Sequence, residues 1–310
     1  MSPPLIVIGG ATATGKTGLA ISLAEASMAD GEIVEVISAD SRQVYRGLDI
    51  GTAKATLAER GRVVHHGLDL VDPDEVFTVA AFSAHVADVL ASLETRGGIA
   101  ILAGGTGFYL RAVVQALDTA RLPADAEVRA YVREALATDG LERTFERLQS
   151  LAPMLSASVE RTNPRRVERA LEIALLQGDV GRPARTAYGG PLLALGLTVA
   201  DDRHRDWIAR RARAQFAAGL IDEAAALRER WDPTLTAFSA IGYREAWSVL
   251  DGDRSIDDAV AADVARNISF AKRQRTWFRA EPSYRWIDAT EVDPTAAALD
   301  ATRAFLAVAR

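Results

Sequence analysis

One stretch near the start of the chain decides the fold: Leu5-Ile6-Val7-Ile8-Gly9-Gly10-Ala11-Thr12-Ala13-Thr14-Gly15-Lys16-Thr17. Its first half is a run of apolar and β-branched residues, which favours a buried strand. Its second half fits the pattern GxxxxGK[ST], whose glycines let successive backbone N–H groups turn inward around phosphate oxygens. A helical pattern follows, with apolar residues at Leu19, Leu23 and Ala26. Strand, loop and helix in this order predict a phosphate-binding loop.

The loop residues have separate expected roles. Backbone groups of the loop would cradle the phosphates, Lys16 would place a positive charge on the terminal phosphates, and the Thr17 hydroxyl would ligate Mg²⁺. Magnesium is the only metal we expect, because the chain has no cysteine and four histidines, too few for an evident zinc site. The expected ligand-binding residues of the loop are Gly10, Ala11, Thr12, Ala13, Thr14, Gly15, Lys16 and Thr17.

Composition bounds the class of protein. A chain of 310 residues with 49% hydrophobic content can bury an ordinary core in one large or two modest domains. The longest apolar stretches fall short of the roughly 18 residues that span a bilayer, and Met1-Ser2-Pro3-Pro4 lacks the features of a secretory signal. We therefore expect a cytoplasmic protein without a membrane partner. Separately, we expect it to act as a monomer.

Short β-branched runs alternate with helical patterns in the first third of the chain, which is typical of βαβ units around a parallel sheet. We expect an α/β protein: a P-loop NTPase-like parallel sheet flanked by helices. Residues 1–116 and 191–310 would form this catalytic core with C-terminal helices, and 117–190 an inserted, mainly helical subdomain. The expected strands are 5–9, 33–38, 99–103 and 192–199, and the expected helices are 17–29, 82–95, 126–138, 141–150, 164–177, 205–220 and 256–279.

Arginine is concentrated in two segments. The net charge of −6 argues against a chain that coats nucleic acid indiscriminately, but a localised basic surface is compatible with it. One cluster lies between Arg161 and Arg169, and the other runs from Arg266 to Arg279 without an acidic residue. Either cluster alone could be a solvated helix face. Together they indicate a polyanion larger than a nucleotide.

Asp40 is the acidic residue best placed for chemistry. It ends the run Ile37-Ser38-Ala39-Asp40, and the carboxyl ends of parallel strands share the sheet edge where such proteins bind ligands. The strand at 99–103 ends on the same edge, in Gly104-Gly105-Thr106-Gly107. Asp40 could hold magnesium, act as a general base towards a second substrate, or cap the next segment.

The segment Ile37-Ser38-Ala39-Asp40-Ser41-Arg42-Gln43-Val44-Tyr45-Arg46-Gly47-Leu48-Asp49-Ile50-Gly51-Thr52-Ala53-Lys54 strongly resembles a signature of the tRNA dimethylallyltransferases, also called tRNA isopentenyltransferases or the IPP transferase family. Further segments similar to this family follow in order, and the resemblance runs from Ile6 to about Trp286. They are His65-His66-Gly67-Leu68, Gly104-Gly105-Thr106-Gly107-Phe108-Tyr109-Leu110, Asn163-Pro164-Arg165-Arg166-Val167-Glu168-Arg169-Ala170-Leu171-Glu172, Ile241-Gly242-Tyr243-Arg244-Glu245 and Ala271-Lys272-Arg273-Gln274-Arg275-Thr276-Trp277-Phe278.

The resemblance implies a reaction: transfer of a dimethylallyl group from dimethylallyl diphosphate to the exocyclic amine of the adenosine 3′ of the anticodon. Asp40 matches the family's proposed base, and Thr106 and Arg211 match positions near the diphosphate, with Lys16 on the other side. The adenosine would be flipped out of the anticodon stem-loop into a channel. The residues that match tRNA-contacting positions, or would face its phosphates, are Asp40, Ser41, Arg42, Gln43, Arg165, Arg166, Arg169, Gly242, Tyr243, Arg244 and Lys272.

Three other functions fit parts of the sequence. An isopentenyltransferase acting on free adenine nucleotide would share the chemistry, but such proteins typically lack much of the helical insert. A small-molecule kinase would hold ATP in the phosphate-binding loop and use Asp40 as the base. An RNA-binding module without catalysis would explain the arginine clusters but not the phosphate loop. The insert and the basic segments favour tRNA as the substrate.

Overall fold

The structure is a computed structural model that describes residues 2–118, 123, 125–180, 186–281 and 283–309. The chain folds as two compact units, which are described separately. Unit 1 consists of Met1–Val114 and Tyr188–Arg310, and unit 2 of Gln115–Ala187.

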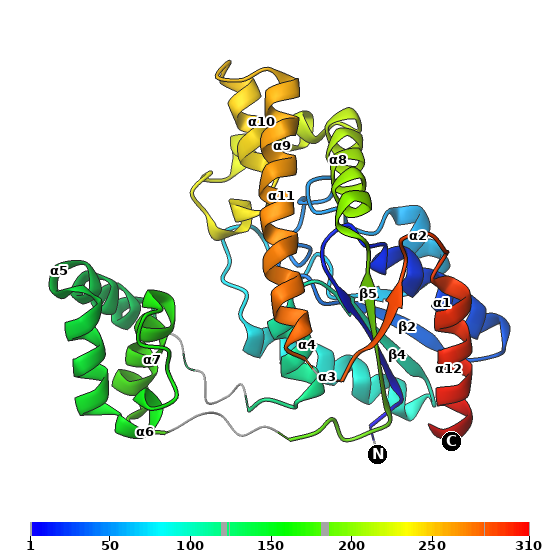
Figure 1. The fold of residues 1–310 in the computed structure, drawn as a ribbon, viewed down its shortest axis with the longest axis horizontal. Helices are drawn as coiled ribbons and strands as arrows, with labels where there is room; N and C mark the ends of the chain where they lie inside the picture. Colours follow the sequence, from blue (N-terminus) through cyan, green and yellow to red (C-terminus); the bar gives the residue numbers. More distant parts are fainter. Residues whose placement is uncertain (1, 119–122, 124, 181–185, 282, 310) are drawn as a thin grey trace. The chain divides into compact units, whose positions relative to one another are not determined.

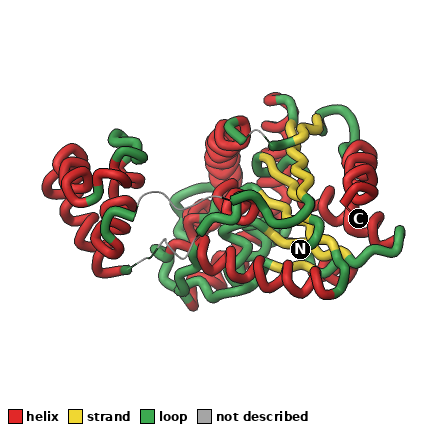
Figure 2. Tube along the Cα trace, turned by 90° about the horizontal axis from the view of Figure 1, so that it is seen from below, coloured by secondary structure: helices red, strands yellow, loops and turns green. Residues whose placement is uncertain are grey.

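Unit 1 is built around a parallel sheet. Its strands lie in the order β3-β2-β4-β1-β5-β6, and each neighbouring pair is parallel. The strand bounds are β1 Leu5–Gly10, β2 Val34–Ser38, β3 His65–His66, β4 Ile99–Gly104, β5 Leu192–Thr198 and β6 Arg285–Asp288. Figure 2 shows these strands side by side with helices around them. The prediction of an α/β fold with a parallel sheet is confirmed.

Helices cover both faces of this sheet (Figure 1). The helices of unit 1 are α1 Lys16–Ala29, α2 Leu57–Arg62, α3 Val79–Thr95, α4 Gly107–Val114, α8 Asp201–Ala217, α9 Leu220–Arg230, α10 Tyr243–Leu250, α11 Ile256–Arg279 and α12 Thr295–Ala309. A short 3₁₀ turn, Thr236–Ser239, precedes α10. Helices α8, α9 and α10 and the first part of α11 lie beyond the carboxyl edge of the sheet, and the end of α11 reaches back to α4, where Phe278 packs in a core on one sheet face.

Alternation along β1 explains the two cores. Ile6 and Ile8 point to the face covered by α1 and α12, whereas Leu5 and Val7 point to the face covered by α3 and α4. All four side chains are fully buried, as expected for a central parallel strand with helices on both sides. Packing on both faces of β1 therefore fixes the carboxyl edge of the sheet, where the phosphate loop begins.

A third core anchors the segment that follows β2. Val44, Tyr45 and Leu48 pack with Phe238 and Tyr243 in a cluster shared with α8, α9 and α10. Leu48 and Tyr243 are fully buried. These helices therefore fix the backbone of the segment that begins at Asp40.

Unit 2 is helical in the residues that the structure describes. Its helices are α5 Ala126–Leu151, α6 Pro153–Ser156 and α7 Pro164–Gln177, around a core that includes Val132, Leu148 and Leu171. Two helices were expected over 126–138 and 141–150. The structure has one element that is broken by non-helical backbone at Gly140, with φ 80° and ψ 170°.

Several boundaries differ from the expectations. Strands β3 and β6 were not predicted, and the helix expected over 205–220 spans Asp201–Ala217. Asp201 and Asp202 favour an earlier start because acidic side chains stabilise a helix N-terminus. Gly219, with φ 101°, ends the helical path before 220. Within the described ranges, no helix is long and apolar enough to cross a membrane.

Candidate active site

The phosphate loop connects β1 to α1 and has the backbone that its glycines allow. Gly10 has φ 152°, and a Cβ there would lie 2.8 Å from the Leu197 carbonyl oxygen, so only glycine fits this crossing. Gly15, the residue before α1, has a left-handed backbone with φ 87°. The first N–H groups of α1 therefore face the loop, where a helix N-terminus attracts phosphate.

Lys16 folds back over this loop. Its Nζ donates a hydrogen bond of 2.5 Å to the Ala11 carbonyl, and Thr14 Oγ1 donates to the same oxygen at 2.9 Å. The pKa of Lys16 is lowered to about 7, because burial and the charge of Arg211 lower it and the charge of Asp40 only partly offsets them. The ammonium group is thus poised to take up an anion, because added negative charge favours its protonated form.

Asp40 lies two residues beyond β2 and is half-buried. Its Oδ1 accepts the Arg42 N–H at 2.8 Å, so the capping role considered for Asp40 is real but uses one carboxylate oxygen. Within the described part of the chain, Oδ2 accepts no hydrogen bond. The turn itself is held by Thr106, whose Oγ1 accepts the Ser41 N–H at 3.1 Å and whose N–H donates to the Ala39 carbonyl at 3.2 Å.

Arg211 reaches the loop from α8. Its Nη1 donates to Thr12 Oγ1 at 2.8 Å and its Nη2 to Asn267 Oδ1 at 2.9 Å. Its Nε is buried without a partner among the described residues. Burial lowers the pKa of Arg211, while the charges of Asp263 and Asp40 raise it. Two cations and Asp40 therefore lie within electrostatic reach of each other at the sheet edge.

Two hydrogen bonds to Thr12 of the phosphate loop come from residues for which the sequence predicted no role. The Thr12 N–H donates to Gln274 Oε1 at 2.7 Å, and His204 Nε2 bonds to the Thr12 carbonyl at 2.8 Å. Gln274 and Asn267 lie on one face of α11, with Asp263 one turn earlier, and all three are buried. The spacing of four and seven residues puts these polar side chains on one helical face, but it does not identify the phosphate loop as their partner.

The segment after Asp40 uses some of its predicted tRNA residues internally. Gln43 accepts the Ser38 hydroxyl at 2.7 Å, and its amide donates to the carbonyls of Thr52 and Ala53 at 3.0 and 3.2 Å. Its amide hydrogens are thus committed to the loop. Arg42 is half-buried, as is Ser41.

Tyr243 and Gly242, two of the predicted tRNA contacts, are both buried. Tyr243 is fully buried, and its hydroxyl donates to Glu223 at 2.7 Å. The same carboxylate accepts the backbone N–H groups of residues 49, 50 and 51 at 2.8 to 3.2 Å. Gly242 is buried as well, and Arg244 is exposed. Both residues lie beneath the surface of this structure, and Tyr243 supports the 49–51 backbone through Glu223. A direct contact of either residue with tRNA stays a prediction.

The predicted arginines of unit 2 differ in their surroundings. Arg165 and Arg166 are exposed at the start of α7, and Arg166 pairs with Glu160 at 2.7 Å. Arg169 instead pairs at 2.7 Å with Glu172, whose side chain is 1% exposed. Arg169 therefore helps to hold unit 2 together.

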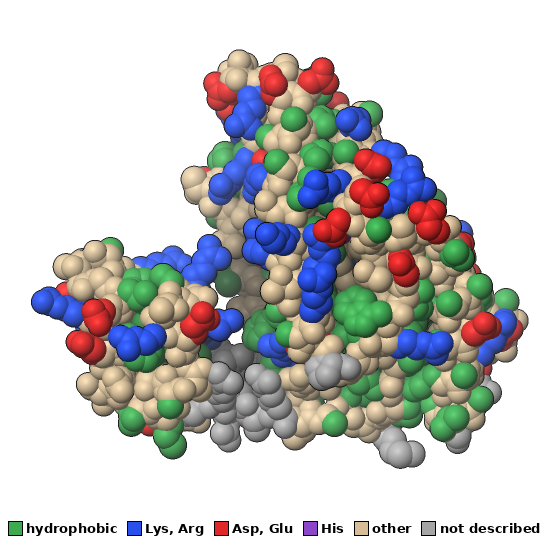
Figure 3. Space-filling view, in the orientation of Figure 1, with side chains coloured by type: hydrophobic (Ala, Val, Ile, Leu, Met, Phe, Trp, Pro, Cys, Tyr) green, Lys and Arg blue, Asp and Glu red, His purple; other side chains and the backbone are tan. Residues whose placement is uncertain are grey.

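A basic surface follows α11 in unit 1. Lys272 is exposed on this helix, as are Arg273 and Arg279. Figure 3 shows Lys and Arg side chains gathered along the course of α11. Such a surface suits a polyanion.

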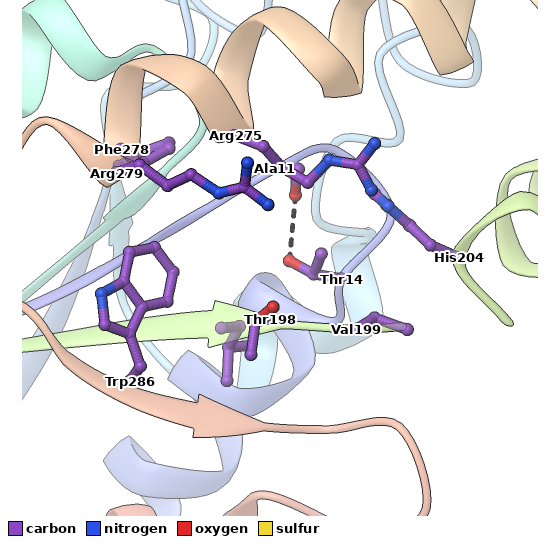
Figure 4. A pocket seen from close by; sticks show the side chains of 10 residues that line it. Ala11, Thr14, Thr198, Val199, His204, Arg275, Phe278, Arg279 and Trp286 are labelled. Atoms are coloured by element: carbon purple, nitrogen blue, oxygen red, sulfur yellow. Dashed lines mark hydrogen bonds between the residues drawn. The ribbon is translucent and has the colours of Figure 1, made fainter. Parts of the chain in front are cut away.

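A cavity of about 250 Å³ lies beside the phosphate loop. Ala11 and Thr14 of the loop form part of its wall, and the side chains of Arg275 and Arg279 extend over it from α11 (Figure 4). Trp286 and Phe278 add aromatic surface. Arg275 is paired with Asp201. The cavity therefore offers both positive charge and apolar surface next to the loop.

Magnesium has a limited protein ligand set here. Among the residues that the structure describes, no group of three His, Cys, Asp or Glu side chains could hold a metal ion. Thr17, the expected ligand, is exposed at the start of α1. This arrangement fits the usual mode of Mg²⁺, which takes one or two protein groups and completes its shell with substrate phosphates and water.

The sheet order, the loop between β1 and α1, and Asp40 beyond β2, which is separated from β1 by β4, define a P-loop-like α/β protein. Residues 43–281 match the model of the IPP transferase family. The chain belongs to this family.

Similar proteins support that assignment over nearly the full length. The chain is 40% identical over 294 residues to a tRNA dimethylallyltransferase of Symbiobacterium thermophilum, covering 94% of this chain and 91% of the relative. A solved full-length tRNA isopentenylpyrophosphate transferase of Bacillus halodurans is 36% identical, with a TM-score of 0.70 and coverage of 98% and 96%. A eukaryotic dimethylallyltransferase acting on tRNA shares the fold, with a TM-score of 0.80 at 23% identity over 100% of this chain and 81% of that one.

Proposed function

We propose that this chain transfers a dimethylallyl group from dimethylallyl diphosphate to the exocyclic amine of the adenosine immediately 3′ of the anticodon in tRNA. The observation that carries the proposal is the gathering of Lys16, Arg211 and Asp40 at one sheet edge, where the charge of Asp40 raises the pKa of both cations. The family and its tRNA-modifying relatives supply the substrate class. All three residues come from one chain, so the proposed site is complete in a monomer.

In the proposed reaction, the adenine amine attacks C1 of the prenyl group. The N–C bond forms as the C–O bond to the diphosphate breaks, and the electron pair leaves with pyrophosphate. An adenine amine is a weak nucleophile because its lone pair is delocalised into the ring, so a base must take its proton. Asp40 is the proposed base, since it lies beyond β2 with one carboxylate oxygen available.

Leaving-group stabilisation would come from the loop and its neighbours. Negative charge grows on the diphosphate as the C–O bond breaks, and donors fixed in advance stabilise that charge most effectively. Lys16, the loop amides and Arg211 are placed for this, and Arg211 has a buried Nε with a hydrogen to donate. Thr106 holds the turn of Asp40 through its hydroxyl, so we assign it to the base side of the site.

Magnesium completes the proposal. When bound, it would neutralise part of the diphosphate charge, held by the Thr17 hydroxyl and by phosphate oxygens. The exposed position of Thr17 beside Lys16 supports this assignment.

The tRNA would bind through exposed arginines and Lys272. Arg165 and Arg166 of unit 2 and Arg244 and Lys272 of unit 1 are exposed, as contacts to RNA phosphates require. The adenosine would leave the stem-loop to reach Asp40 near Ser41 and Arg42. We place this reaction in the cytoplasm, with its tRNA substrate.

The direct test offers labelled dimethylallyl diphosphate to the purified chain with either an anticodon stem-loop or AMP. Label in the stem-loop alone is the expected result. Label in AMP would favour the free-nucleotide isopentenyltransferase. In a parallel reaction with γ-labelled ATP in place of the prenyl donor, transfer of the γ-phosphate would favour the kinase.

A further inference from the structure

Thr12, in the middle of the phosphate loop, is held at all three of its polar groups. Arg211 donates to its hydroxyl at 2.8 Å, and His204 Nε2 bonds to its carbonyl at 2.8 Å. Its N–H donates to Gln274 Oε1 at 2.7 Å. The loop is therefore tied to α8 twice and to α11 once.

Gln274 also reaches the opposite side of the site. Its Nε2 donates to the Gly105 carbonyl at 2.9 Å. Gly105 precedes Thr106, whose hydroxyl accepts the Ser41 N–H next to Asp40. A single side chain thus links the proposed leaving-group cradle to the turn that carries the proposed base.

The local packing makes this link rigid. Gln274 is 7% exposed, and its neighbours on the same face of α11, Ala271 and Phe278, are 1% exposed each. A Cβ at Gly105 would lie 2.4 Å from Gln274 Nε2, so glycine at 105 is what lets the amide approach. A glutamine amide has one acceptor and one donor end, and both ends are used between two backbone segments.

We infer that Gln274 is a positioning residue that fixes the spacing between the phosphate loop and the Asp40 turn. This inference rests on the proposed function, because bond formation at the amine and bond breakage at the diphosphate must occur in one geometry. A displacement of about 1 Å can cost on the order of 100-fold in rate without any loss of contacts to the reacting atoms. Gln274 needs no contact with either substrate to act in this way.

Two variants separate the two hydrogen bonds. Gln274→Met keeps the length of the side chain and removes both, whereas Gln274→Glu keeps an acceptor for the Thr12 N–H and loses the donor to Gly105. Gln149→Met is the matched control, because Gln149 is exposed on α5. The measurements are the single-turnover rate of prenyl transfer with both substrates saturating, and the dissociation constants of an unreactive thio-diphosphate analogue of the donor and of the stem-loop.

Gln274→Met should lower the single-turnover rate by roughly 10- to 100-fold, with less than a threefold change in either dissociation constant. Gln274→Glu should also lose at least about tenfold in rate, and Gln149→Met should stay within about twofold of the wild-type chain. Such a separation of rate from affinity is the signature of positioning, since a purely structural role would alter stability and a binding role would alter affinity.

The inference is overturned if Gln274→Met transfers the prenyl group within twofold of the wild-type rate, or if its loss lies entirely in donor affinity. Failure of both Gln274 variants to fold, judged by circular dichroism, would assign Gln274 to stability and overturn it as well. If the wild-type chain itself transfers no prenyl group, the proposed function fails instead. The two failures are therefore distinguishable.

Discussion

Replacing Asp40 by asparagine removes a negative charge while keeping the shape of the side chain. The Arg42 N–H donates to Oδ1 of Asp40, and an asparagine carbonyl oxygen can accept the same bond. The turn should therefore survive. The proposed base is lost, and general-base catalysis contributes roughly 10²- to 10⁴-fold. We expect Asp40→Asn to lower the single-turnover rate by that factor at pH 7.

The substitution has a second, pH-dependent effect. Asp40 raises the pKa of Lys16, which stands at about 7, so its removal should move that pKa lower. Less Lys16 is then protonated at pH 7, and the donor should bind somewhat more weakly. At pH 6 the ammonium form returns and donor affinity should recover, whereas the loss in rate should remain.

The assay is rapid-quench measurement of single-turnover prenyl transfer at pH 6, 7 and 8, with donor affinity from titration calorimetry at each pH. Asp74→Asn is the matched control, because Asp74 is exposed in the loop before α3. A rate within tenfold of wild type, with folding intact, would exclude Asp40 as the base. Full rescue of the rate at pH 6 would place the defect at Lys16 instead.

Three further results are expected. Donor affinity should increase as the pH falls from 8 to 6, because Lys16 gains its charge below a pKa of about 7. In calorimetry, Lys16→Met should bind the donor more weakly and should lack the part of the pH dependence that comes from Lys16. The same pH dependence of donor affinity in Lys16→Met and the wild-type chain would refute this role of Lys16. Tyr243→Phe should lower the free energy of unfolding by about 1–2 kcal/mol in chemical denaturation, because Glu223 loses a buried donor. Normal stability with weakened tRNA binding would instead favour Tyr243 as a tRNA contact. Arg165→Ala should reduce the slope of log affinity for tRNA against log salt by about one; an unchanged slope would remove Arg165 from the interface.

Local sequence signals predicted the helices whose ends are set by residues close in the sequence. The helices expected over 164–177 and 256–279 have those bounds in the structure. Both have strong start signals: Asn163 accepts a backbone N–H at the start of α7, and Ser255 does so at the start of α11. These caps satisfy backbone donors that the first turn leaves free.

The edge strands could not be predicted in the same way. Strand β3 is two residues long, and β6 has four residues of which three are exposed. Neither sequence shows the apolar alternation that marks a strand. Both strands form by pairing with strands distant in the sequence, β3 with β2 and β6 with β5. Edge strands of this kind depend on tertiary contacts.

The site was predictable to the extent that it follows motifs. The glycine pattern predicted the backbone of the phosphate loop, and the strand order puts Asp40 at the same sheet edge. The contact between Thr12 and Gln274 joins residues 262 positions apart, and periodicity within one helix does not identify such a partner. Burial of Tyr243 was missed for the same reason, since an aromatic residue with a polar tip is compatible with either a surface or a core.

Mass spectrometry of tRNA nucleosides tests the central claim most directly. Total tRNA from cells that contain this chain should hold adenosine carrying a dimethylallyl group, or a product derived from it, next to the anticodon. The same nucleoside should disappear when the chain is removed and return when it is restored, but not when Asp40→Asn is supplied at equal abundance. An unchanged nucleoside profile without the chain would contradict the proposed reaction.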